Sequence, residues 1–511
     1  MAVTQSFGRS ALMRAALLTT GSTYITFVLG LLVSVLIARV LGPEDYGRYA
    51  YVVWLSGILI MLTNNGLNMT GTKFVSEALG REEPETAARI HGWLLRKQWW
   101  SVGLVGVIFL CCLPFIKPAG WEGHLAVLGA MVLSATVFKA LSLFNTSVAK
   151  GYGQFWIEAL TNLTASVFNA IVAAGLAWLW PSSLSFVAMY MLTNLSYVLM
   201  SWGLMRRRRL VADDARPSQE WLLRVRPHLW WTIGLTALGA LGAKSVETLL
   251  LNAWAGAAEV GYYAIATGLS RGGVELLAAG LSTVVMPVFG YAFGSGDRDR
   301  IRRVFEDTMR FYQFLGLIIA GVGWFWAEVL VHLMYGAKYM DVVPVFQIIV
   351  VAAGASLANA APTAMLTNSD NQRFRVVVTV LSVASTAAVA AILIPLYGAI
   401  GAAVANFATS GLSTAVSVWG IRRYVQLDAP WKLLARQYLC AFVAAGVGYG
   451  VVWLAGPRWG AWAAGPIYAA ALVLLSTRMA VWRTEELGQA GAFLERLPPS
   501  LHWVRRLLGT T

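Results

Sequence analysis

The stretch LWWTIGLTALGALGAKSVETLLLNAWAGAAEVGYYAIATGLSRGGVELLAAGLSTVVMP, residues Leu229–Pro287, decides how this chain folds. It contains two apolar segments, each near the ~20 residues that a helix needs to cross a bilayer. We expect a turn between them over residues 256–264. The decapeptide AGAAEVGYYA at Ala255–Ala264 repeats LGPEDYGRYA at Leu41–Ala50 with an offset of 214 residues, and the offset continues downstream. The hairpin therefore begins the second half of a duplicated chain.

The composition indicates an integral membrane protein. Hydrophobic residues make up 58% of the 511 residues and charged residues 13%, whereas soluble domains carry about 25% charged residues. The mean hydropathy is +0.63, so the bilayer must act as the solvent for most of the chain. The net charge of +14 lies in the loops between apolar segments. That pattern is typical of positive-inside topology and does not indicate a nucleic-acid partner.

The apolar segments predict an all-α integral membrane protein with about 14 transmembrane helices. Since the repeat relates six helices to six, we expect two pseudo-symmetric six-helix bundles plus two extra C-terminal helices, a plan found in secondary transporters. The predicted spans are 18–41, 49–70, 99–116, 123–146, 159–180, 184–204, 229–253, 262–287, 311–334, 345–367, 376–396, 399–419, 437–455 and 459–477. The predicted domains are an N-terminal bundle 1–204, a basic linker 205–228, a C-terminal bundle 229–420, the extra helices 421–477 and a tail 478–511.

Positive charge is distributed unequally between the two sides of this arrangement. With the N-terminus in the cytoplasm, 31 of the 39 lysines and arginines lie on the inner side, five on the outer side and three inside spans. This bias predicts that both termini are cytoplasmic. Two inner segments, 87–99 and 299–311, are basic and amphipathic, and we expect them to form interfacial helices at matching places in the two halves.

Four formal charges lie inside the two apolar segments of the charged hairpin, which we define as Leu229–Pro287. They are Lys244 and Glu247 in the first segment and Arg271 and Glu275 in the second. Charge in hydrocarbon costs several kcal/mol unless it is paired or faces water. Two interpretations remain open: two ion pairs that lock the hairpin, or a wet cavity in which the cations bind an anionic group and the carboxylates pair with them or exchange a coupling ion. The repeat favours the cavity, because the equivalent first-half residues are uncharged: Gly30, Val33, Gly57 and Met61.

Polar residues elsewhere could belong to the same cavity. Lys139 lies deep inside the fourth span, where snorkelling to the inner interface is the alternative to a functional role. Together with Lys244 and Arg271 it would make the cavity net positive, which suits a phosphate or pyrophosphate group. Asn64, Asn65 and Asn68 cluster in the second span and are candidates for contact with sugar hydroxyls. Hydrogen bonding between helices is the alternative role for them.

The sequence predicts no enzyme activity and no cofactor. It contains no GxxxxGK phosphate loop, no HExxH motif and no nucleophile elbow. The three cysteines, Cys111, Cys112 and Cys440, fall inside apolar segments without the spacing of a metal site or a disulfide framework. The only small ion expected is a coupling H⁺ or Na⁺.

Several motifs resemble those of a known family. LIARVLGPEDYGRYAYV (Leu36–Val52) resembles the first-loop signature of bacterial polysaccharide and O-antigen repeat-unit flippases. These proteins belong to the multidrug/oligosaccharidyl-lipid/polysaccharide (MOP) exporter superfamily. MYGAKYMDVVPVF (Met334–Phe346), LYGAIGAAVAN (Leu396–Asn406) and TNSDNQRF (Thr367–Phe374) resemble later signatures, so the resemblance spans about residues 11–422. The cationic residues match the family by character and depth and not by an exact motif.

The resemblance implies a flippase of the bacterial inner membrane. The expected substrate is an undecaprenyl-pyrophosphate-linked oligosaccharide repeat unit of O-antigen or exopolysaccharide, moved from the inner to the outer leaflet by alternating access coupled to an ion. Membrane lipids, and possible polysaccharide polymerase and glycosyltransferase partners, are implied in the same way. The alternative is a multidrug or small-molecule exporter of the same superfamily. A net positive cavity disfavours cationic drugs.

Overall fold

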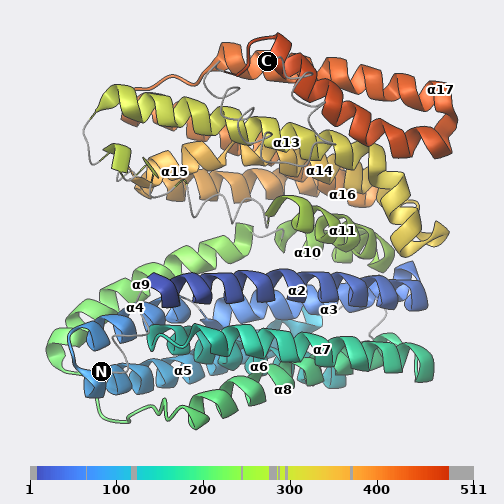
Figure 1. Cartoon of the computed structure of the whole chain (residues 1–511). Coiled ribbons are helices and arrows are strands. Elements are labelled where there is room, and N and C mark those ends of the chain that lie inside the picture. Colours follow the sequence, from blue (N-terminus) through green and yellow to red (C-terminus); the bar gives the residue numbers. More distant parts are fainter. Residues whose placement is uncertain are drawn as a thin grey trace. The chain divides into compact units, whose positions relative to one another are not determined.

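The computed structural model describes residues 9–64, 66–116, 123–242, 245–275, 285, 288–289, 291–293, 297–368 and 372–482. Every regular element in these ranges is a helix, so the all-helical prediction is confirmed. The contacts divide the chain into two compact units, Met1–Ala264 and Ile265–Thr511, and each is described by itself (Figure 1). The predicted linker 205–228 lies within the first unit, because α9 packs against α3 and α4.

The first unit is a bundle in which α2 packs on α7, and α6 packs on α3, α4 and α8. Its helices are α2 (Arg9–Leu41), α3 (Pro43–Asn64), α4 (Leu67–Gly80), α5 (Pro84–Ile116), α6 (Leu125–Gly151), α7 (Phe155–Leu179), α8 (Ser183–Arg207), α9 (Gln219–Gly242), α10 (Ser245–Trp254) and most of α11 (Ala257–Ser270).

In the second unit, α13 packs against α14 and α17, and α14 packs against α16. Its elements are the π-helix η1 (Arg271–Glu275), α13 (Arg298–Tyr335), the short η2 (Ala337–Tyr339), α14 (Val342–Leu357), α15 (Ala360–Asn368), α16 (Gln372–Gly420), the π-helix η3 (Ile421–Val425) and α17 (Trp431–Arg478).

Each of the fourteen predicted spans overlaps a described helix. Ten helices are long and apolar enough to cross a membrane, or eleven when α3 and α4 count as one bent span, among the residues that the structure describes. Two long helices each hold two predicted spans, because α16 breaks at Gly398 and α17 at Gly456, both with positive φ. Such backbone angles are favourable only for glycine, so these residues let the chain reverse within one or two positions.

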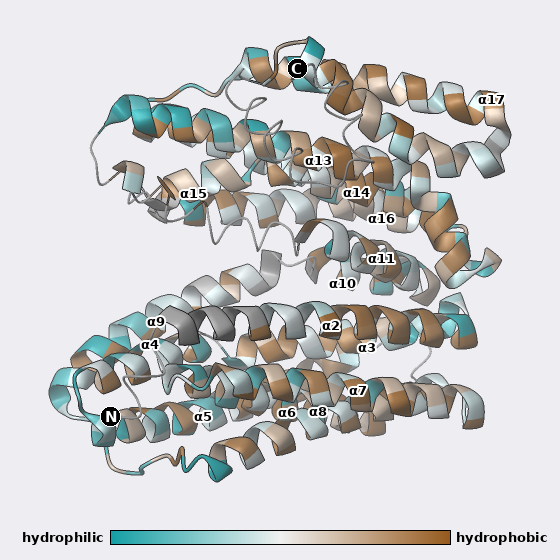
Figure 2. Cartoon of the chain, in the orientation of Figure 1, coloured by the Kyte–Doolittle hydropathy of each residue, from teal (hydrophilic) through white to brown (hydrophobic). Residues whose placement is uncertain are grey.

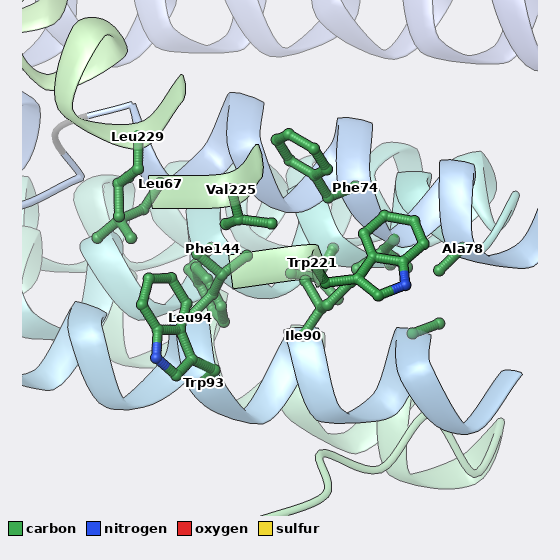
Figure 3. Packing of buried hydrophobic residues seen from close by; sticks show 14 of the residues in the cluster. Leu67, Phe74, Ala78, Ile90, Trp93, Leu94, Phe144, Trp221, Val225 and Leu229 are labelled. Carbon is green, nitrogen blue, oxygen red and sulfur yellow. The ribbon is translucent and has the colours of Figure 1, made fainter. Parts of the chain in front are cut away.

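The outward surfaces are apolar, as lipid requires. Figure 2 shows apolar residues along the middles of the helices and hydrophilic residues gathered toward their ends. Phe115, Trp178 and Trp453 are each more than 80% exposed, which would be unfavourable in water over so many residues. Inside the first unit, Phe74, Phe144 and their neighbours form a buried cluster (Figure 3).

Two local expectations differ from the structure. The segments 87–99 and 299–311 are not separate interfacial helices, because α5 and α13 continue through them into the spans without a break. The hairpin turn also does not extend over 256–264. Only residues 255 and 256 are non-helical, and α11 begins at Ala257. The positive φ of Gly256 completes the reversal in that short space.

The two copies of the repeated decapeptide contact each other within the first unit. A Cβ on Gly47 would overlap the carbonyl oxygen of Ala257, and a Cβ on Gly261 would lie 3.0 Å from the carbonyl oxygen of Pro43. Gly47 corresponds to Gly261 and Pro43 to Ala257 under the 214-residue offset. The contact is therefore pseudo-symmetric, and glycine at both places allows the two backbones to approach closely.

Candidate functional site

The second span is broken where α3 meets α4. The two helices are bent by 40°, and Gly66 joins them with a φ of +74°. Helix α9 packs on this break, since a Cβ on Gly66 would lie 2.5 Å from the Cβ of Thr232. On the other side, the Gln98 side chain of α5 donates from Nε2 to the carbonyl oxygen of Thr63 at 3.3 Å. A broken helix of this kind is where transporters place polar groups at membrane depth.

Three side-chain oxygens around the break have no hydrogen-bond partner in the described part of the chain. They are Oδ1 of Asn64, Oδ1 of Asn68 and Oε1 of Gln98, and all three atoms are buried. Buried polar atoms are nearly always paired in folded proteins, so each of these acceptors is suited to a donor or a cation that arrives with a ligand. Asn65, the third predicted member of this cluster, lies outside the described residues.

Lys139 lies near the middle of α6, and it does not extend to an interface. Its Nζ stands over the ring of Tyr197 on α8, 3.0 Å from the centroid. No ion pair includes Lys139 within the described ranges. A cation–π contact stabilises an ammonium group by about 0.5–2 kcal/mol, which is less than burial of an unpaired charge costs. Lys139 is therefore a basic group held inside the bundle with no carboxylate at ion-pair distance among the described residues.

The Tyr197 backbone is fixed in turn by α6. The Ser142 hydroxyl donates to the Tyr197 carbonyl oxygen at 3.1 Å, and one turn further the Asn145 amide donates to the Ser201 hydroxyl at 3.3 Å. These bonds join α6 to α8 at Tyr197 and one turn beyond it. The platform beneath the Lys139 ammonium group is consequently rigid.

In the charged hairpin, Glu247 is buried, with 2% of its surface exposed. Tyr263 of α11 donates its hydroxyl to Glu247 Oε1 at 3.4 Å. Arg271 lies about two helical turns beyond Tyr263, at the start of the π-helix, and is exposed within its unit. Because α11 begins at Ala257, Tyr263 lies on the second helix of the hairpin, and its hydroxyl is a described partner of Glu247 on the first.

The predicted site residues that the structure describes are divided between the two units. Lys139, Asn64, Asn68 and Glu247 all lie in the first unit, and Arg271 lies in the second. Lys244 and the side chain of Glu275 lie outside what is described. In the described ranges, no group of three or more His, Cys, Asp or Glu side chains could hold a metal ion.

Gln98 and Tyr197 are the residues that the sequence did not indicate. Gln98 is fully buried and supports the helix break, and a polar amide directly before the predicted span 99–116 was the available signal. Tyr197 carried no such signal, because an aromatic residue in a membrane helix is ordinary. Its role depends on the packing of α8 against α6.

Comparison with known proteins identifies one matching family and several solved structures of similar fold. A family model described as "Polysaccharide biosynthesis protein" matches residues 36–344. No curated protein sequence matches the chain.

Solved structures share the fold at low sequence identity. The lipid II flippase MurJ in its inward closed conformation is 13% identical, with a TM-score of 0.72 over 91% of this chain and 100% of that chain. An inward-facing multidrug resistance MATE family transporter of the MOP superfamily is also 13% identical, with a TM-score of 0.66 over 79% of this chain and 96% of that one. A Vibrio cholerae MATE transporter is 17% identical, with a TM-score of 0.55 over 83% and 99%.

Proposed function

Because the chain belongs to the polysaccharide biosynthesis protein family, and has the fold of the flippases and exporters of the MOP superfamily, we propose that it is a lipid-linked oligosaccharide flippase. It moves undecaprenyl-pyrophosphate-linked repeat units for O-antigen or exopolysaccharide from the inner to the outer leaflet of the bacterial inner membrane. Movement occurs by alternating access, with both termini in the cytoplasm. The chain performs no catalysis of its own.

Lys139 is the observation that carries this proposal. An ammonium group inside an apolar bundle, with no carboxylate at ion-pair distance among the described residues, favours an anionic ligand, and a pyrophosphate offers several charged oxygens to it. Lys244 and Arg271 are proposed to complete the cationic site. The unpartnered oxygens of Asn64, Asn68 and Gln98 support binding of sugar hydroxyls, which donate hydrogen bonds. Asn65 is proposed to act with them.

An exporter of small molecules or drugs is the second candidate, and the likeness to MATE transporters favours it. Cationic drugs would need a net negative site. Glu247 is the one buried carboxylate described in the hairpin, and it is bound to the Tyr263 hydroxyl. We propose that Glu247 and Glu275 serve ion coupling or charge pairing, with H⁺ or Na⁺ as the ion.

Deletion of the gene separates the two candidates. The flippase proposal expects lipid-linked oligosaccharide to accumulate in the cytoplasmic leaflet, with surface polysaccharide lost. Membrane lipids surround the protein, and a polysaccharide polymerase and glycosyltransferases are the proposed partners before and after translocation. Unchanged surface glycan together with altered dye efflux would contradict the flippase and support the exporter.

Substitution of Lys139 tests the site. Lys139→Gln should lower export at least tenfold at normal protein levels, because one charge-assisted contact contributes about 1.5–3 kcal/mol. Lys139→Arg should retain part of the activity. Lys432→Gln, at an exposed lysine outside the site, is the matched control and should export normally.

Lys244→Ala and Arg271→Ala extend the same test to the hairpin. Both variants should lose export while the protein accumulates normally in the membrane. Normal export by both would remove them from the site. Loss of the protein itself would instead indicate that these charges lock the hairpin.

A further inference from the structure

A pocket of about 610 Å³ lies within the first unit, beside the start of α4, and Lys139 is not among its lining residues. Its walls come from α5, from the segment that connects α8 to α9, from α9 and from the first residue of α4. It is lined by Leu67, Trp93, Arg96, Lys97, Trp100, Ser101, Asp214, Arg216, Leu222, Arg226, Leu229, Trp230 and Ile233. The charge bias of the sequence predicts that this end of the bundle faces the cytoplasm.

The pocket is strongly cationic. Four basic side chains line it, and Asp214 is the single acidic residue among them. Arg96 already has an anionic partner, since its Nη1 donates to the Asp214 carbonyl oxygen at 2.9 Å and to the Asp214 carboxylate at 3.3 Å. Lys97, Arg216 and Arg226 are exposed and take part in no ion pair within the described residues. Three cations therefore share one pocket with no carboxylate at ion-pair distance among the described residues, and a bound anion would reduce their mutual repulsion.

The rest of the lining is apolar and aromatic. Leu67, Trp93 and Leu229 belong to the buried cluster of Figure 3 and give the pocket an apolar wall. Trp100 and Trp230 are 76% and 72% exposed. Exposed tryptophans beside basic residues are typical of the membrane–water interface, where ring and indole N–H face different media. The pocket thus combines anion-binding groups with a surface suited to the glycerol and first methylenes of a lipid.

The connecting segment is docked rigidly, so the pocket is preformed. The Asp213 N–H donates to the Ala88 carbonyl oxygen at 3.0 Å, and Arg89 Nε donates to the Asp213 carboxylate at 3.3 Å. A Cβ on Gly92 would overlap the Asp213 carbonyl oxygen, so the two backbones are in close contact. The backbone N–H of Ala215 and the Arg89 guanidinium hold the pKa of the Asp213 carboxyl below its usual value. The contact between Arg89 and the Asp213 carboxylate therefore persists as the pH falls, and it is lost only at a pH below the ordinary titration range of an aspartate.

We propose that this pocket binds the phosphate-bearing head group of an anionic membrane phospholipid. A soluble anion would not use the exposed tryptophans and the apolar wall beside the cations. The transported substrate is disfavoured because all lining residues lie in one unit, whereas a transporter of this plan binds its substrate between its two halves. A lipid here can remain bound to the first unit throughout the transport cycle.

Native mass spectrometry of the detergent-solubilised full chain tests the proposal. The chain is titrated with dioctanoyl phosphatidylglycerol or with dioctanoyl phosphatidylcholine, and the fraction that carries one bound lipid is measured. The wild type should bind phosphatidylglycerol at least tenfold more tightly than phosphatidylcholine. Lys97→Gln/Arg226→Gln should lose about tenfold or more of that affinity, because two charge-assisted contacts are removed.

The matched control is Arg207→Gln/Arg209→Gln, which removes the same charge from exposed arginines outside the pocket. It should bind phosphatidylglycerol within twofold of the wild type. Equal loss in both double variants would overturn the proposal, since only net charge would then matter. A second variant, Arg216→Gln, repeats the test at a separate wall of the pocket, and melting temperatures verify that each variant is folded.

Two competitors identify the source of the phosphate. Inorganic phosphate at millimolar concentration should not displace phosphatidylglycerol, and displacement would assign the pocket to a soluble anion. A polyprenyl pyrophosphate should bind the Lys97→Gln/Arg226→Gln variant as well as it binds the wild type. If this variant loses polyprenyl pyrophosphate instead, the pocket belongs to the transported substrate and the proposal is wrong.

Discussion

At the scale of single residues, Gly66 fixes the geometry of the broken second span. Its φ of +74° and its contact with Thr232 both exclude a side chain. The neighbouring Asn64 and Asn68 lie on the two sides of this break, and their side-chain oxygens have no hydrogen-bond partner in the described part of the chain. Placement of these acceptors therefore depends on one residue that does not touch the ligand itself.

Gly66→Ala should destabilise the protein by about 1 kcal/mol for the backbone alone, and by about 1–3 kcal/mol more for overlap with Thr232. The melting temperature in detergent should fall accordingly. Gly57→Ala is the matched control, because Gly57 lies inside α3 with nothing within 4 Å of an added Cβ. That substitution should be neutral or stabilising. A similar loss in both variants would contradict the role assigned to Gly66.

At the scale of elements, the repeated decapeptide forms a contact with its own copy. Gly47 at the start of α3 meets Ala257, and Gly261 at the start of α11 meets Pro43. Each copy thus supplies a glycine and a carbonyl group. Because each copy of the duplicated motif contacts the other in the same way, one sequence motif supplies two equivalent contacts.

Gly47→Val and Gly261→Val should therefore have similar effects. Each side chain would overlap backbone atoms that cannot rotate away, at a cost of about 1–3 kcal/mol, and both variants should melt at lower temperature. Because the two substitutions act on one contact, the double variant should lose less stability than the sum of the singles. Strict additivity in a double-mutant cycle would show that the two glycines do not share a contact.

At the scale of the whole molecule, the distribution of positive charge predicts orientation. Fourteen spans are an even number, so the two ends lie on the same side, and 31 of 39 basic residues predict that this side is the cytoplasm. A fluorescent protein that folds only in the cytoplasm, fused to either terminus, should be bright. Alkaline phosphatase, which is active only outside, should be inactive at both termini and active at residue 181 between α7 and α8. Opposite results at the two termini would require an odd number of spans.

The sequence by itself determined the class of protein, the helices and the duplication. The length of each apolar segment and the distribution of positive charge can be read directly along the chain. The breaks at Gly398 and Gly456 accordingly fall between predicted spans. The 214-residue offset likewise identified the glycines that later proved to be in contact.

Only the tertiary structure decided which groups meet. Tyr197 lies beneath Lys139, Gln98 supports the break, and Tyr263 binds Glu247. The two tyrosines have no distinctive sequence signal. The hairpin turn was predicted too long, because helical propensity across Ala257–Ala264 competes with a motif that resembles a loop. The cationic pocket brings Lys97 and Arg226 together from segments more than 100 residues apart. The composition gives the number of basic residues, but only the packing of the helices places these two in one pocket.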